Sequence, residues 1–197
     1  WTASADAFGF STSTKKVLQF LMPYLAFGVF LLVNAIAKHE LQPFYVYALV
    51  IIALIIANLL SKGNPATQLL IFSLFGIAAL LIAIFSPDYN ISVYAICSVG
   101  LFCSTLWPCI FTLSISGLGK HTSEGSNFLI FMICGGGIVS LLQGYLAADN
   151  LLGIAMSYFV GIACFAYLAY YAVKAKSDLK NQGIDLDELS NTKGGGH

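Results

Sequence analysis

Apolar residues are gathered into six long runs that are separated by short polar stretches. Each run is close to or above the roughly 18 residues that a helix needs to cross the hydrocarbon core of a membrane. Because the connections are short, consecutive helices must be antiparallel neighbours. The pattern therefore predicts an all-α, polytopic membrane protein with six transmembrane helices, over residues 17–37, 43–60, 67–86, 91–115, 127–147 and 153–173.

The composition leads to the same class. Hydrophobic residues make up 58% of the chain and charged residues 9%, with a mean hydropathy of +0.85. Soluble domains are about half apolar and about a quarter charged. The formal net charge is zero, so nothing draws the chain to nucleic acid. The five cysteines lie in apolar runs without the spacing of metal or redox sites, so we predict no metal site and no cofactor.

The lysines, which are the only basic residues besides histidine, predict an orientation. If Lys15 and Lys16 face the cytoplasm, alternate connections place eight of the nine lysines on that side and only Lys38 on the other. This is a strong positive-inside asymmetry. It predicts a cytoplasmic C-terminus, in the inner membrane of a bacterium.

Polar and helix-breaking residues gather in the segment 100–149. Pro108 interrupts one apolar run, whereas a triple glycine at 135–137 and Gln143 lie within the next. Hydrocarbon offers no hydrogen-bond partner to a freed carbonyl or an amide. Such residues therefore indicate packed neighbouring helices or a water-filled path.

Four residues of the first of these runs share one helix face, at positions i, i+3, i+7 and i+10: Ser104, Trp107, Phe111 and Ser114. An aromatic ring flanked by hydroxyls suits a sugar, although packing between helices explains the face equally well. Pro108 frees a backbone carbonyl around Ser104, which predicts a kink there.

The next run carries a stripe of small residues, Gly136, Ser140 and Gly144, which lets helix backbones approach closely. We interpret this stripe as helix packing. Gln143 and Asn127 carry amides that can both donate to and accept from a sugar hydroxyl. They are candidate ligands, and the alternative for Asn127 is a residue at a helix start.

The motifs in this region resemble those of the fucose–galactose–glucose:proton symporter family of the major facilitator superfamily. They are GLFCSTLWP at 100–108, GLGKHT at 117–122, the triple glycine at 135–137 and QGY at 143–145. In that family this pattern spans the tenth and eleventh helices, and the run 153–173 would be the twelfth. The resemblance covers roughly residues 67–175. Because the chain starts at Trp1 without a methionine, we expect it to be the C-terminal part of a longer protein.

The chain departs from the family pattern in two places. Three apolar runs precede the tenth helix where the family usually has one, so we predict an inserted helix pair, and Ser140 stands where relatives often have proline. The predicted organisation is a cytoplasmic segment that follows a preceding helix, the inserted pair, the transporter helices and a polar cytoplasmic tail, over residues 1–16, 17–66, 67–174 and 175–197.

The resemblance implies import of a hexose or deoxyhexose by proton symport through alternating access. Trp107, Asn127, Gln143 and Ser104 are the candidate sugar-binding residues, and the partners are a monosaccharide, protons and lipid. No acidic or basic residue lies in the middle of any run, so we expect the proton-coupling carboxylate outside this chain. The alternative is a membrane-embedded scaffolding subunit. An enzyme is not expected, because no catalytic arrangement is present. We expect a monomer, although the sequence does not establish the oligomeric state.

Overall fold

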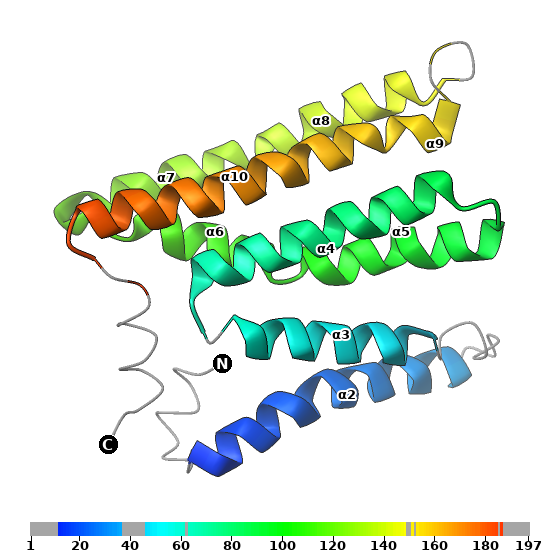
Figure 1. Ribbon diagram of the computed structural model, residues 1–197, viewed down its shortest axis with the longest axis horizontal. Helices are drawn as coiled ribbons and strands as arrows, with labels where there is room; N and C mark the ends of the chain where they lie inside the picture. Colours follow the sequence, from blue (N-terminus) through cyan, green and yellow to red (C-terminus); the bar gives the residue numbers. More distant parts are fainter. Residues whose placement is uncertain are drawn as a thin grey trace. The chain divides into compact units, whose positions relative to one another are not determined.

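A computed structural model of the chain describes residues 12–36, 46–61, 63–148, 151, 153–184 and 186. Every regular element in these ranges is a helix (Figure 1). The chain divides into two units, residues 1–56 and 57–197, which we describe separately. Most of the predicted segment 1–16 and much of the predicted tail lie outside the described residues.

The first unit contains α2 (Thr12–Ile36) and most of α3 (Val46–Leu60). On α2, the rings of Phe27 and Phe30 are stacked with their centroids 6.4 Å apart. The Asn34 amide donates to the Phe30 carbonyl one turn earlier, at 2.9 Å. The two helices coincide with the first two predicted spans, but their role as an insertion stays a prediction.

In the second unit, α4 (Pro65–Phe85) is the central helix. It packs against α5 (Tyr89–Cys103), α6 (Leu106–Ile115) and α10 (Phe159–Asn181), as Figure 1 shows. Its buried residues recur every three or four positions, which is the spacing of one helix face. They are Ala66, Leu69, Phe72, Ser73, Gly76, Ala79, Leu80 and Ala83.

The start of α4 is closed by a side-chain cap. The Asn64 Oδ1 accepts from the backbone N–H groups of Ala66 and Thr67, and Pro65 occupies the first helical position, where no N–H is needed. One turn further on, the Gln68 amide donates to Asn58 Oδ1 of α3 at 3.2 Å. These bonds join the end of α3 to the beginning of α4.

Three of the remaining predicted spans are each divided into two helices. The span 91–115 becomes α5 and α6, and 127–147 becomes α7 (Thr122–Met132) and α8 (Cys134–Leu146), after the short helix η2 (Gly119–His121). The span 153–173 becomes α9 (Gly153–Ser157) and α10. At each division the backbone forms bonds between residues three apart, as from Ile133 N–H to the Ile130 carbonyl, and these tighten the turn.

Within the described residues, four helical stretches are long and apolar enough to span a membrane. They are Pro65–Phe85, Tyr89–Ile115, Gly119–Leu146 and Gly153–Asn181. Two shorter apolar stretches, Tyr24–Ile36 and Val50–Leu60, lie in α2 and α3. The prediction of an all-α polytopic membrane protein is therefore confirmed. Four stretches of the described residues have the length and hydropathy of a span, and the prediction of six rests on the sequence.

Candidate functional site

The candidate site is built around the break between α5 and α6. The N–H of Ser104 donates to the Leu101 carbonyl at 3.2 Å, and α6 restarts two residues later at Leu106. Pro108 has no N–H to offer the Ser104 carbonyl. The break places Pro108 in the first turn of α6, where a proline costs little. The helix thus ends at the position where the sequence predicts a kink.

The residues beside the break combine an aromatic ring with hydroxyl groups. Trp107 is 42% exposed, and its ring lies 6.4 Å from that of Phe111 with a tilt of 45° between the planes. The exposed Ser104 donates its hydroxyl to the Leu101 carbonyl at 2.6 Å. An indole next to polar groups can stack on the apolar face of a sugar ring while its hydroxyls find partners.

Thr105 is a residue of this site that the sequence analysis missed. Its Oγ1 is buried, and it has no hydrogen-bond partner among the described residues. A buried hydroxyl without a partner is costly, so it marks a place where a bound water would be stabilising. In the sequence, the signal that could have pointed to Thr105 was its position between Ser104 and the turn that contains Pro108.

Ser114 does not belong to the same surface as Ser104. Its hydroxyl is 2.6 Å from the Tyr171 hydroxyl of α10, so it joins α6 to α10. The spacing of residues in the sequence predicted that Ser104 and Ser114 share one face of a continuous helix. The break between α5 and α6 interrupts that helix between them. Tyr171 was not identified from the sequence.

The two candidate amides lie on the next span. Asn127 is exposed in the interior of α7, which begins at Thr122, so the interpretation of Asn127 as a helix-start residue is wrong. Gln143 is half-buried on α8. Within the described part of the chain, no hydrogen bond links Trp107, Asn127 and Gln143 to one another. Their role as ligands therefore stays a prediction.

The small-residue stripe on α8 faces open space in this chain. A Cβ placed on Gly136 or on Gly144 would meet nothing within 4 Å, and the exposed Ser140 donates its hydroxyl to the Gly136 carbonyl at 2.8 Å. α8 contacts α7 and α9. The stripe is thus available to a further helix, but its packing role stays a prediction.

The described residues hold no group of three or more His, Cys, Asp or Glu side chains placed to bind a metal ion. Cys109 is buried, and the other four cysteines are exposed on helix surfaces as free thiols. At the turn before α7, His121 Nδ1 lies 3.0 Å from Glu124 Oε2, with both side chains well exposed.

Comparison with known proteins identifies the relatives of this chain. It is 39% identical over 104 residues to a glucose/galactose transporter of Brucella abortus, across 53% of this chain and 25% of that protein. The predicted resemblance is confirmed. The chain is also 33% identical over 116 residues to the L-fucose-proton symporter of Escherichia coli K12, across 58% of this chain and 26% of the relative.

The chain spans about a quarter of the length of these two relatives. No protein-family model matches the chain, and no solved structure matches it. The relatives are transporters rather than enzymes, and the helices are long enough to cross a bilayer. The chain is therefore an integral membrane protein with similarity to sugar transporters.

Proposed function

We propose that this chain forms part of a secondary active transporter that imports a hexose or deoxyhexose by proton symport. The observation that carries the proposal is the similarity to a glucose/galactose transporter and to an L-fucose-proton symporter. The break between α5 and α6 supports it, because the Trp107 ring is exposed in the first turn of α6. The exposed ring offers an apolar surface on which a sugar can stack.

In this mechanism, the sugar ring stacks on Trp107 and its hydroxyls bond to the amides of Asn127 and Gln143. Two helix bundles then rock around the site, which opens alternately to each side of the membrane. An interrupted helix fits this role, since a broken transmembrane helix is stable where its free backbone groups line a cavity. The proton-coupling carboxylate belongs to the remainder of the protein.

The proposed orientation places the C-terminus in the cytoplasm of a bacterium, with the protein in the inner membrane. The lysines that the structure describes near the ends of spans agree with this assignment. Lys120 lies in η2, and Lys174, Lys176 and Lys180 lie in the last turns of α10. These two segments are separated by an even number of spans, so they lie on the same side of the membrane.

The test is uptake of labelled fucose, galactose and glucose by cells that express the full-length protein, with the proton gradient intact or collapsed. We expect uptake of one sugar that depends on the gradient. Asn127→Ala and Gln143→Ala should each reduce uptake about tenfold at equal membrane abundance, because each removes a hydrogen bond to the substrate. Asn90→Ala, an exposed amide in the first turn of α5, is the matched control.

Failure to take up any of the three sugars would overturn the sugar assignment. Uptake that is unaffected by both amide substitutions would leave a sugar transporter whose binding site lies elsewhere. A protein that reaches the membrane, does not transport and still binds a partner protein would favour the scaffolding alternative.

A further inference from the structure

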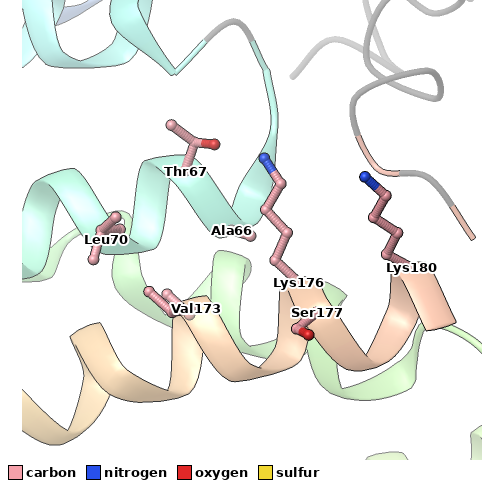
Figure 2. A pocket seen from close by; sticks show the side chains of 8 residues that line it. Ala66, Thr67, Leu70, Val173, Lys176, Ser177 and Lys180 are labelled. Carbon is pink, nitrogen blue, oxygen red and sulfur yellow. The ribbon is translucent and has the colours of Figure 1, made fainter.

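A pocket lies between the first turns of α4 and the last turns of α10, away from the candidate sugar site. Its volume is about 360 Å³. α4 and α10 also form the most extensive helix pair of the second unit, and the pocket lies at the edge of their interface, where Ala66 and Ala172 are buried. The lining residues are Ala66, Thr67, Leu70, Ala172, Val173, Lys176, Ser177 and Lys180 (Figure 2).

The lining is divided into an apolar part and a basic part. Leu70, Ala172 and Val173 lie toward the membrane-spanning parts of the two helices, whereas Lys176, Ser177 and Lys180 lie where α10 leaves the apolar span. Val173, Lys176 and Lys180 are three or four residues apart, so they share one face of α10. Figure 2 shows both lysine side chains extending from this face.

The charged residues of the lining are both basic. Two of its eight lining residues are lysines, two carry hydroxyls and none is acidic. The nearby acidic residue of α10, Asp178, is paired with Lys174 at 3.1 Å, and neither of these lines the pocket. The positive end of the α4 dipole adds to the field. The backbone N–H groups of Ala66 and Thr67 are already bonded to Asn64, so the lysines and hydroxyls would make the contacts.

We propose that this pocket binds the phosphate headgroup of one anionic phospholipid. Lys176 and Lys180 would pair with the phosphate, and the hydroxyls of Thr67 and Ser177 would donate to its oxygens. The acyl chains would follow the apolar surface that continues from the pocket, where Val173 on α10 and Leu74 on α4 are more than half exposed. Leu74 lies one turn beyond Leu70 on the same face of α4.

A lipid fits these observations better than a soluble phosphate for a physical reason. A free phosphate would use the basic part of the lining and leave the apolar part in contact with water. A phospholipid satisfies both parts at once, and the pocket lies where a charged headgroup meets the hydrocarbon, at the end of two spans. The bound lipid would join α4 to α10 at this end of the bundle.

The experiment counts lipids bound to the purified full-length protein by native mass spectrometry. The added probes are phosphatidylglycerol, phosphatidylcholine with the same acyl chains, and inorganic phosphate as a competitor. We expect one tightly bound phosphatidylglycerol. Phosphatidylcholine should bind more weakly, by about tenfold or more, because its headgroup carries no net charge to attract the two lysines. Inorganic phosphate at millimolar concentration should not displace the lipid.

The variant is the double substitution Lys176→Gln and Lys180→Gln, which should weaken phosphatidylglycerol binding by on the order of tenfold. The control is Lys120→Gln, which removes a charge from an exposed lysine that does not line the pocket. The control should change binding less than twofold. Lys176→Arg with Lys180→Arg keeps the charge and should retain the lipid.

Three results would overturn the proposal. Equal weakening by the variant and the control would mean a diffuse surface attraction. Equal binding of the two lipids would mean that headgroup charge is not recognised. This comparison uses only the wild-type protein, so it remains valid if the glutamine variant fails to fold. Displacement by inorganic phosphate would assign the pocket to a soluble anion.

Discussion

Gly76 of α4 and Phe165 of α10 are packed so closely that no side chain fits between them. A Cβ on Gly76 would lie 2.6 Å from Phe165 Cε1 and 2.7 Å from Cζ, and Phe165 is itself buried. The absence of a side chain at position 76 thus creates the recess that the ring occupies. A second close approach lies nearby, where a Cβ on Gly161 would be 3.1 Å from Leu80 Cδ1.

Gly76→Ala should therefore destabilise the protein. Overpacking of a core costs about 1–3 kcal/mol, and the higher helix propensity of alanine returns at most about 1 kcal/mol. We expect the melting temperature of the full-length protein in detergent to fall by roughly 2–4 °C. The control is Gly100→Ala on α5, where a Cβ would meet nothing within 4 Å, and its melting temperature should hold or rise.

The contact itself can be tested by a second substitution. Phe165→Leu removes the end of the ring that approaches Gly76, so the double variant with Gly76→Ala should be more stable than the sum of the two single effects predicts. Simple additivity of the two effects would contradict the packing described here.

The bond between Ser114 and Tyr171 should stabilise the pairing of α6 with α10. Ser114→Ala and Tyr171→Phe each remove one hydroxyl of the 2.6 Å contact, and the two together form a double-mutant cycle. Hydrogen bonds between membrane helices average about 0.6 kcal/mol, so we expect a coupling energy of about 0.5–1.5 kcal/mol in unfolding measurements.

Ser116→Ala is the matched control for this cycle. Ser116 is the C-cap residue of α6, and its hydroxyl bonds to the Thr112 carbonyl of that helix at the same 2.6 Å, so it should show no coupling to Tyr171. A coupling energy at Ser116 as large as that at Ser114 would mean that the cycle reports a general change in α6.

Loss of the cap on α4 should also be measurable. Asn64 is 2% exposed and accepts two backbone N–H bonds. Asn64→Ala should reduce the free energy of unfolding by about 1–2 kcal/mol, whereas Asn64→Asp, which keeps the acceptor, should cost less. The exposed cap Asp88 on α5 accepts a single bond, from the Asn90 N–H, so Asp88→Ala should have a smaller effect than Asn64→Ala. The reverse order would contradict the role given to Asn64.

The positions of the transmembrane helices could be predicted well from the sequence where an apolar run is bounded by clear signals. The predicted span 67–86 corresponds to α4, because Asn64 and Pro65 mark its start and Ser86 with Pro87 its end. The start of α7 was missed by five residues, at Thr122 instead of Asn127. The polar residues of its first turns made that helix appear to begin later.

Contacts between distant residues could not be predicted. Ser114 and Tyr171 are 57 positions apart, and periodicity contains no information about which helices become neighbours. The contact of Gly76 with the Phe165 ring could not be predicted either, because it depends on how α4 packs against α10. The break near Ser104 was predictable because Pro108 acts locally, whereas the buried hydroxyl of Thr105 became evident only in three dimensions.

The break between α5 and α6 leads to the last prediction, which concerns Pro108. Pro108→Ala restores an N–H that can bond to the Ser104 carbonyl and so favours a continuous helix. We expect the melting temperature to hold or rise, because a helix gains a bond, while sugar uptake falls about tenfold, because the Trp107 ring loses its position. A loss of uptake together with a loss of stability would instead indicate simple unfolding. Trp107→Ala should reduce uptake similarly, whereas Phe85→Ala, which removes an exposed aromatic ring at the far end of α4, should not.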